Sequence, residues 1–581
     1  MDPTPHLVIE AAPQAVFRTL PARADRVRYR LGVQPDAATW RWSDFASALR
    51  AVACALRAHG LHTDERAAVF ASNRVEWMVA ALAIQAQGSA MVPVYPTTTV
   101  DGLGYQLDHG DVTVLFVDGA AQLERVARAL PAAPRLRQVI WLGDAADLRA
   151  ALARLGADAE ARGDAGLAVG LSWLAAHSRG FDVALAEGDA LDKRDPSVFE
   201  RTLDGLALDR PGILLYTSGT TGRPKGVPLT HRNVAINGCD WIRCNAPLLE
   251  DGDDDLLWLP MSHVFGFGEA CLGNTLGFRS TLATPLDVLQ LLPQARPHVF
   301  MSVPAYWEKL AQGALQAGPD EAAVGQRLRA LVGDRLRFCL SGGAGLDRSV
   351  KELFHRHGLL ILEGYGLTEA SPTLTLNRPD AFRFDTVGRV LPSVEVKLAA
   401  DGEILARGPS IFQGYHKDPE ATATTFDAEG WLLTGDLGRF TDDGFLQIIG
   451  RKKEILVTAG GKNVPPANIE MRFADDPLIA QTMVYGDGKR YLVAGFWLNP
   501  AEAQRLCAGL SATAAAARLQ EVLQARVDRV NADLDSYMTV KKFAVFDHPL
   551  TPEDGTLTAT LKLRRKQIQE RYGARFEELY L

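Results

Sequence analysis

The segment YTSGTTGRPKGV, residues 216–227, gathers the groups that proteins use to hold a polyphosphate. Its glycines permit positive φ angles and let the backbone come close to a ligand. Its hydroxyls donate hydrogen bonds to phosphate oxygens, and its lysine adds a point charge. An apolar run before the segment predicts a strand, and the residues after Thr230 are helix-like, which disfavours a simple surface turn. We therefore predict a phosphate-binding loop formed by Thr217, Ser218, Gly219, Thr220, Thr221, Gly222 and Lys225.

Two commoner nucleotide-binding loops are excluded. A Walker A loop requires Gly-Lys followed by Ser or Thr after four intervening residues, and the chain has no such run. A dinucleotide fingerprint requires a further glycine three residues after Gly-x-Gly. Neither residues 266–268 nor residues 364–366 meet that requirement.

A second motif, GYGLTE at residues 364–369, follows an apolar run and carries three further functional groups. Tyr365 offers a flat face for a base, and Thr368 offers a hydroxyl for phosphate. Glu369 supplies the hard oxygen that Mg²⁺ prefers. Because these groups suit the base, the phosphate and the metal of one nucleotide, the motif points to ATP.

Four more segments carry candidate ligand groups. Residues 341–345, SGGAG, form a loop where only the backbone can approach a ligand. Asp436, after Thr-Gly, places a carboxylate where ribose hydroxyls can bind. Residues 450–454 form a compact charged turn, and Lys562 lies between a polar loop and a basic helix.

The elements that must position these motifs change in character near residue 450. Before it, short β-type runs alternate with helical patterns, for example at 67–70, 112–117 and 337–340, which predicts doubly wound α/β layers. After it, strands at 478–485 and 491–498 flank a Gly-rich turn, followed by a helical stretch over 501–535 and a strand at 543–546. We predict a large N-terminal domain (1–449), a hinge (450–453) and a small mobile α+β domain (454–581).

Composition excludes several classes of protein. Of the 581 residues, 47% are hydrophobic and 23% are charged, which is ordinary for a globular protein. A net charge of −8 without a long Lys/Arg run argues against nucleic-acid binding. The six cysteines have no CxxC spacing, which indicates reduced thiols in a cytoplasmic protein and neither a disulfide frame nor a zinc site.

The chain is not expected to cross a membrane. The most apolar tract, residues 77–94, is interrupted by two glutamines, a glycine and a proline, and it predicts a buried helix that leads into a strand. The N-terminal residues lack the pattern of a signal peptide. Peripheral contact with the inner surface of a membrane stays open.

Taken together, these segments occur in the order and at the approximate spacing of the adenylate-forming superfamily, which the chain resembles over nearly its whole length. That superfamily comprises acyl-CoA synthetases, peptide-synthetase adenylation domains and luciferases. The resemblance implies a two-step reaction: a carboxylate attacks the α-phosphate of ATP to give an acyl-adenylate and pyrophosphate, and a thiol then displaces AMP.

The resemblance also implies roles for individual residues. The loop from Tyr216 to Lys225 holds the phosphates, and Glu369 ligates Mg²⁺. The nucleotide contacts are assigned to Tyr365, Gly366 and the Gly343–Ala344 backbone at adenine, Thr368 at the α-phosphate, and Asp436 and Arg451 at ribose. Lys562 bridges the carboxylate and the phosphate, and Lys453 is the hinge residue.

Within the superfamily, the chain is most similar to bacterial long-chain fatty acyl-CoA synthetases. The stretches that carry this similarity are 259–265, 303–309, 362–372 and 457–464, with Ala305 standing where that group usually has arginine. The implied substrates are a fatty acid, ATP and CoA. The expected acyl-pocket residues are Trp241, His263, Phe265, Phe267 and Tyr306.

Rival functions can be weighed from the residues. An amino-acid-activating domain needs a carboxylate within residues 258–270, where only Glu269 is found, and a hydrolase is disfavoured because no serine sits in a G-x-S-x-G motif. A fatty acyl-AMP ligase that passes the acyl group to an acyl carrier protein remains open, although residues 438–450 look too short for its usual insertion. An aryl or medium-chain acyl-CoA ligase remains open too. A non-catalytic nucleotide or lipid sensor is disfavoured, because the candidate catalytic side chains are all present.

Overall fold

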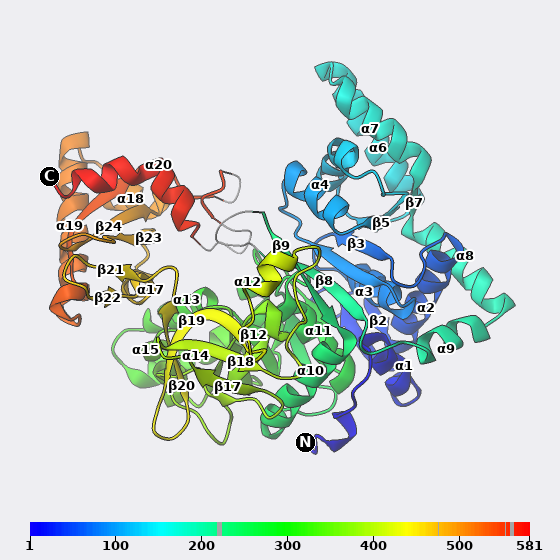
Figure 1. The fold of residues 1–581 in the computed structure, drawn as a ribbon, viewed down its shortest axis with the longest axis horizontal. Helices are drawn as coiled ribbons and strands as arrows, with labels where there is room; N and C mark the ends of the chain where they lie inside the picture. The colour runs from blue at the N-terminus through cyan, green and yellow to red at the C-terminus, as the bar shows by residue number, and fades with distance from the viewer. Residues whose placement is uncertain (218–222, 475, 552–553, 558–562) are drawn as a thin grey trace.

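The computed structural model describes residues 1–217, 223–474, 476–551, 554–557 and 563–581. Figure 1 shows a large N-terminal part built on several sheets, and a smaller C-terminal part, orange to red, beside it. The α/β class predicted from the alternating pattern is confirmed.

A seven-stranded sheet organises the first part of the chain. Its order is β7 (Ser178–Gly180), β6 (Gln138–Trp141), β5 (Val112–Val117), β3 (Arg66–Phe70), β4 (Ala90–Val94), β8 (Pro211–Thr217) and β9 (Lys225–Thr230). All neighbouring strands are parallel except β8 and β9. The predicted strands at 67–70 and 112–117, and the helix-to-strand run at 77–94, are therefore confirmed.

Helices bury both faces of the sheet. The helices of this part of the chain are α1 (Ala12–Arg23), α2 (Trp42–Ala58), α3 (Val75–Ala86), α4 (Val100–His109), α5 (Ala120–Ala129), α6 (Ala145–Arg162), α7 (Ala165–His177), α8 (Phe181–Arg194) and α9 (Ser197–Asp204). Alternate residues of one strand enter different cores: Val69 joins the core of α2 and α3, whereas Phe70 joins that of α4 and α5. This alternation is the expected period of two for a strand covered on both sides.

A nine-stranded sheet positions most of the candidate site. Its order is β16 (Arg389–Val390), β15 (Thr373–Leu376), β14 (Ile361–Gly366), β13 (Phe338–Ser341), β12 (Val299–Ser302), β10 (Asp254–Leu257), β11 (Arg279–Leu282), β1 (Val27–Arg30) and β2 (Thr39–Arg41). Its helices are α10 (His231–Asn245), α11 (Val264–Leu276), α12 (Val288–Ala295), α13 (Pro304–Leu315), α14 (Glu321–Val332) and α15 (Arg348–Arg356). Because β13 and β14 are parallel, the two loops that follow them meet at one edge, where ligands commonly bind.

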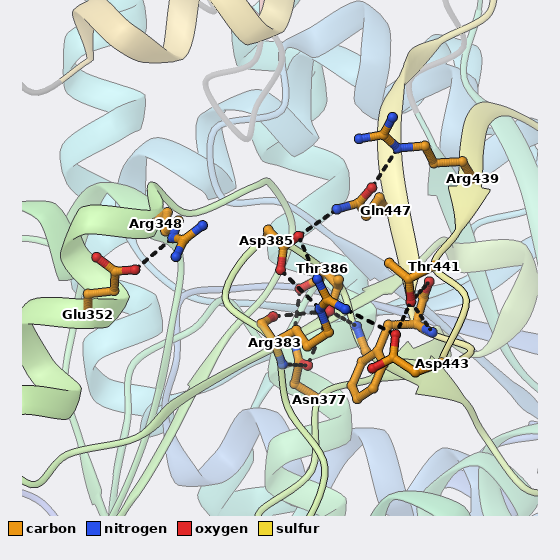
Figure 2. Close-up of polar contacts among 12 residues, drawn as sticks. Arg348, Glu352, Asn377, Arg383, Asp385, Thr386, Arg439, Thr441, Asp443 and Gln447 are labelled. Carbon is orange, nitrogen blue, oxygen red and sulfur yellow. Dashed lines mark hydrogen bonds and ion pairs between the residues drawn. The ribbon is translucent and has the colours of Figure 1, made fainter.

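An antiparallel four-stranded sheet follows. It consists of β17 (Glu395–Leu398), β18 (Glu403–Arg407), β19 (Leu432–Phe440) and β20 (Leu446–Arg451), with α16 (Pro419–Ala423) inserted before β19. Figure 2 shows how the loop at 377–387 is tied to the β19–β20 hairpin: Arg383 bonds Asp443 at 3.0 Å, and Gln447 bonds Asp385 at 2.7 Å. This network anchors the hairpin to the loop between β15 and β16.

The C-terminal part has its own cores. Its strands are β21 (Leu456–Val457), β22 (Asn463–Val464), β23 (Ile479–Tyr485), β24 (Leu492–Leu498) and β25 (Val540–Phe546), and its helices are α17 (Pro466–Glu470), α18 (Pro500–Leu506), α19 (Ala512–Ala532) and α20 (Arg565–Glu578). The predicted β23–β24 hairpin and the strand β25 are confirmed. The single helical stretch predicted over 501–535 is two helices, because Gly509 adopts a positive φ of 77° and Ser511 caps α19.

Short 3₁₀ helices complete the described structure: η1 (Thr4–His6), η2 (Leu130–Ala132), η3 (Ala246–Leu248), η4 (Thr368–Ala370), η5 (Met471–Phe473) and η6 (Ser536–Met538). All six cysteines are free, and four of them are buried. Within the described ranges, no helix combines the length and apolar character needed to span a membrane.

Candidate functional site

The predicted phosphate loop lies at the turn of a hairpin. Thr217 ends β8 and stands opposite Lys225, which begins β9. The helix predicted after Thr230 is confirmed as α10, which begins at His231. The strand β9 between the loop and this helix was not predicted; its buried Val227 and Leu229 alternate as a strand requires. Ser218, Gly219, Thr220, Thr221 and Gly222 lie outside the described residues.

Lys225 and Glu369 meet at one aromatic ring. Lys225 Nζ lies 4.6 Å from the centroid of the Tyr415 ring, and Tyr415 Oη donates a hydrogen bond of 2.8 Å to Glu369 Oε1. Tyr415 was missed in the sequence analysis. Its signal was a glycine (Gly414, φ 144°) before an aromatic residue, followed by Asp418, which caps α16.

His109 contacts the strand that leads into the loop, and His416 contacts His109. Tyr216 Oη lies 2.9 Å from His109 Nδ1, and His416 Nε2 lies 3.1 Å from the carbonyl oxygen of His109. Burial and neighbouring cations lower the pKa of His416 to about 4. A neutral His416 beside the loop adds no charge to the phosphate end at neutral pH.

Tyr365, Asp436 and Arg451 come together from three strands. Tyr365 Oη on β14 donates a hydrogen bond of 2.7 Å to Asp436 Oδ2 on β19. Arg451 on β20 stands opposite Asp436 in the ladder, with its Nε 3.2 Å from Asp436 Oδ1. Burial, together with the charge of Asp436, raises the pKa of Tyr365 well above its usual value. The phenol therefore stays protonated and holds the carboxylate in place.

The loop after β13 is fixed by a buried carboxylate. Gly343 adopts a φ of 87°, which favours glycine, and Ala344 follows it. Glu363 Oε1 on β14 accepts a hydrogen bond of 3.0 Å from the amide of Leu346, and Glu363 also pairs with the buried Lys351. These contacts hold the loop after β13 against β14.

Gly366, within the GYGLTE motif, has no room for a side chain. A Cβ on Gly366 would lie 1.9 Å from the carbonyl oxygen of Pro372, so only glycine fits there. Thr368 and Glu369 follow on η4, half-buried, at the end of β14. The described residues contain no cluster of three or more His, Cys, Asp or Glu side chains that could hold a metal ion on their own.

An apolar cavity of about 130 Å³ begins beside η4 and reaches the N-terminal segment. Ser371 to Thr373 line one part of it and residues 6–15 contribute another. Trp241, Phe265 and Phe267, three of the expected acyl-pocket residues, line this cavity.

The other two expected pocket residues lie elsewhere. Tyr306 packs on Trp258, with ring centroids 4.3 Å apart, and donates to the carbonyl of Pro285 at 2.8 Å. His263 caps α11, where its Nδ1 accepts a hydrogen bond of 3.1 Å from the amide of Phe265. His263 therefore sets the start of the helix that carries Phe265 and Phe267.

The residues on either side of Lys453, the predicted hinge residue, form ion pairs with different parts of the chain. Lys452 Nζ reaches Asp401 at 2.6 Å and Glu403 at 2.7 Å, on the N-terminal side. Glu454 lies 3.5 Å from Arg565, at the start of α20. Lys453 lies exposed between these anchors. Lys562 lies outside the described residues, and Arg565 follows it by three positions.

Comparisons with known proteins agree with this geometry. Residues 18–416 match the AMP-binding enzyme family, and residues 453–581 match the AMP-binding enzyme C-terminal domain. The chain is 31% identical over 594 residues to the long-chain-fatty-acid–CoA ligase FadD15 of Mycobacterium bovis, covering 93% of this chain and 92% of that protein. It is 27% identical over 581 residues to the long-chain-fatty-acid–CoA ligase 6 of Mus musculus, covering 89% and 79%.

A solved structure shows the same fold. The adenylation domain of a carboxylate reductase from Mycobacterium chelonae superposes with a TM-score of 0.81 at 23% identity, covering 98% of this chain and 91% of that one. Because the family match spans more than half of the residues and the first relative spans nearly all of them, the chain belongs to the AMP-binding enzyme family.

Proposed function

We propose that this protein activates a fatty acid in two steps. The carboxylate attacks the α-phosphorus of ATP, which forms acyl-AMP and releases pyrophosphate; the thiol of CoA then attacks the acyl carbon and releases AMP. Full-length similarity to long-chain-fatty-acid–CoA ligases supports this function. The observation that carries it is the meeting of Lys225, Tyr415 and Glu369 next to an apolar cavity.

Positive charge is the main requirement of the first step, because a carboxylate and a triphosphate repel each other. Lys225, at the mouth of the hairpin turn, is proposed to neutralise phosphate oxygens, with the hydroxyls and amides of the loop as further donors. Thr368 is proposed to contact the α-phosphate. Lys562 is proposed to bridge the attacking carboxylate and the phosphate, which brings the two anions into reacting geometry.

Glu369 fits a magnesium ion. Mg²⁺ is commonly held in proteins by one or two carboxylates together with substrate phosphates and water, so a single carboxylate beside the phosphate loop is a suitable donor set. The hydrogen bond from Tyr415 orients Glu369 through Oε1. When bound, Mg²⁺ would neutralise phosphate oxygens as negative charge develops on them.

The nucleoside is proposed to bind at the Tyr365–Asp436–Arg451 cluster. Asp436 accepts hydrogen bonds readily as an ionised carboxylate, which suits the ribose hydroxyls. Tyr365, Gly366 and the Gly343–Ala344 backbone are proposed to form the adenine site. Since the cluster joins β14 to the β19–β20 hairpin, nucleotide contacts would come from both sheets.

The apolar cavity is proposed to take the acyl chain. Each methylene that is buried contributes about 0.8 kcal/mol. A long alkyl chain is therefore favoured over acetate or butyrate.

A moving C-terminal domain would serve both steps. We propose a core of residues 1–449, a hinge at 450–453 and a domain of 454–581 that carries Lys562. Lys452 is anchored to the core side and Glu454 to α20, which supports a pivot at Lys453. Rotation would remove Lys562 from the carboxylate while CoA enters.

AMP release tests the proposed function. The substrates are a series of acids from acetate to octadecanoate with benzoate and cinnamate, each with ATP, Mg²⁺ and CoA. We expect turnover that consumes one CoA for each AMP and rises from butyrate toward dodecanoate and longer acids. Stable acyl-AMP without CoA-dependent turnover would instead identify a ligase that serves an acyl carrier protein, and a maximum at an aromatic acid would indicate an aryl-CoA ligase.

Lys562→Ala separates the two half-reactions. We expect at least about a 10²-fold loss of adenylation, the effect of one preorganised charge contact. Thioester formation from supplied acyl-AMP should continue. Equal loss in both half-reactions would assign Lys562 a structural role.

A further inference from the structure

A fully buried carboxyl group lies in the wall of the apolar cavity. Glu269 on α11 is 1% exposed and lines the cavity. Among the described residues, neither of its carboxyl oxygens has a hydrogen-bond partner. Because an unpaired buried polar group is unfavourable, this carboxyl needs a partner that the described part of the chain does not provide.

The surroundings of Glu269 favour the neutral form of its carboxyl group. Burial raises its pKa well above the usual value, and the negative charge of Asp255 raises it further. The buried Arg28 directs its hydrogen bonds to Asn274, to Ser280 and to the carbonyls of Ala270 and Phe278. A protonated carboxyl group offers one O–H donor together with acceptor oxygens.

A second polar atom in the same wall also lacks a partner. Gln85 on α3 is 2% exposed, and its Nε2 donates a hydrogen bond of 3.0 Å to the carbonyl of Gly212. This bond fixes which side of the amide carries oxygen. Within the described ranges, Gln85 Oε1 has no hydrogen-bond partner. Glu269 and Gln85 are therefore two groups of the cavity lining whose buried oxygens lack a partner among the described residues.

We propose that the acyl chain taken by this cavity carries a hydroxyl group that pairs with Glu269. This inference rests on the proposed function, because it treats the cavity as the acyl site. A hydroxyl donates one hydrogen bond and accepts others, which suits a protonated carboxyl group. A substrate ammonium group is disfavoured, because it needs Glu269 to be ionised where burial and Asp255 oppose that charge.

We therefore expect the protein to prefer fatty acids whose hydroxyl group is on one particular carbon. The end of the cavity at Ser371 to Thr373 lies next to η4, where the carboxylate reacts under the proposed function. The distance from that end to Glu269 sets which carbon must carry the hydroxyl. A plain alkyl chain leaves Glu269 unpaired, and a site built to bind a hydroxyl discriminates against the analogue that lacks it.

The test compares dodecanoate with its isomers that carry one hydroxyl at successive carbons. AMP release is measured with ATP, Mg²⁺ and CoA for each acid. For one position of the hydroxyl, we expect kcat/KM to exceed that of dodecanoate by about 10-fold or more. In Glu269→Leu this isomer should lose its advantage, while dodecanoate is activated at least as well as by the native protein. Glu269→Gln, which can still form hydrogen bonds, should retain part of the preference.

Asp118→Asn is the matched control. Asp118 also has a buried carboxyl oxygen without a partner among the described residues, but it does not line the cavity, so the preference should persist in this variant. Equal kcat/KM for plain and hydroxylated acids in the native protein overturns the inference. So does a preference that survives in Glu269→Leu, or a stronger preference for amino-substituted dodecanoate. If none of the acids releases AMP, the proposed function itself fails, which is a distinct result.

Discussion

Tyr415 Oη donates a hydrogen bond of 2.8 Å to Glu369 Oε1, while the face of the same ring lies 4.6 Å from Lys225 Nζ. One side chain thus contacts both the carboxylate proposed for Mg²⁺ and the lysine proposed for phosphate. Tyr415 precedes α16, whereas Glu369 is on η4 and Lys225 is on β9. We infer that Tyr415 is a positioning residue that sets the geometry of the phosphate end.

Tyr415→Phe removes this hydrogen bond and keeps the ring under Lys225. We expect kcat/KM for ATP to fall by about 10-fold, which equals about 1.4 kcal/mol and is close to the lower end of the range, about 1.5–3 kcal/mol, for a hydrogen bond to a charged group. The concentration of Mg²⁺ needed for half-maximal activity should rise, and pyrophosphate exchange measures both effects. Tyr485→Phe is the matched control, because Tyr485 bonds Glu577 at 2.6 Å in the C-terminal part. An unchanged Mg²⁺ requirement in Tyr415→Phe would contradict the positioning role.

Asp436→Asn tests the nucleoside site. This change keeps the shape of the side chain but removes its negative charge. In the native protein, that carboxylate pairs with Arg451 and accepts a hydrogen bond from Tyr365. We expect KM for ATP to rise by about 10-fold or more, since charged hydrogen bonds contribute about 1.5–3 kcal/mol, while KM for the fatty acid changes little. Asp443→Asn, in the network of Figure 2, is the control on the same hairpin. A larger effect on the fatty acid than on ATP would place Asp436 outside the nucleotide site.

Lys453→Pro tests the hinge. Proline fixes its own φ near roughly −65° and also restricts the preceding residue, Lys452. We expect acyl-AMP formation at a nearly native rate and the loss of most thioester formation, measured as separate half-reactions. Lys453→Ala, which removes the charge and keeps the backbone free, should retain both steps. If the proline variant also retains both, the pivot lies elsewhere.

His231 should make the protein less stable in mild acid. Burial lowers its pKa from 6.5 to about 4, so the folded protein keeps this histidine neutral while the unfolded chain takes up a proton below pH 6.5. The stability that it contributes is present above pH 6.5 and is lost as the pH falls toward 4. At 1.36 kcal/mol for each pKa unit, the loss is at most about 3 kcal/mol.

Urea unfolding of the native protein and His231→Gln at a series of pH values measures this effect. The difference in unfolding free energy between the two proteins should change with pH below 6.5 and stay flat above it. His548→Gln, at an exposed histidine, should follow the native curve much more closely. A pH-independent difference for His231→Gln would show that its neutral state is not favoured by folding.

Glu269 should make the folded protein less stable as the pH rises, which is the opposite of the effect of His231. Its raised pKa means that the folded protein retains a proton that the unfolded chain releases above its ordinary pKa near 4.5. Stability is therefore reduced as the pH rises. Glu269→Gln should be more stabilising at pH 8 than at pH 5, measured by thermal unfolding without ligands. An equal effect at both pH values would show that Glu269 is not held neutral.

The motifs and their order could be read from the sequence because each is a short, local run of glycine, hydroxyl and charged residues. The parallel strands β3 and β5 and the hairpin β23–β24 were predicted for the same reason: each is a short apolar run with clear turn signals. Strand β9 was missed because Pro228 interrupts its pattern and its pairing with β8 spans the phosphate loop. Pairing of this kind depends on tertiary structure and not on local preference.

Contacts between distant segments were beyond the reach of local patterns. Tyr415 meets Glu369 across 46 positions, and nothing near Tyr415 in the sequence indicates that pairing. Glu269 was noted as the sole carboxylate in its segment, yet its burial and unpaired oxygens appear only when α11 is packed. Tyr306 stays a predicted pocket residue, and the packing of its ring on Trp258 is a contact that the local sequence pattern does not indicate.

The bonds that tie the β19–β20 hairpin to the loop at 377–387 bear on the order in which products leave. Asp436 and Arg451 lie on this hairpin, before the proposed pivot at Lys453. The ribose contacts would then stay with the core while the C-terminal domain turns, so the nucleoside remains seated when Lys562 withdraws. Pyrophosphate should therefore depart before CoA reacts, and AMP should be the last nucleotide fragment to dissociate.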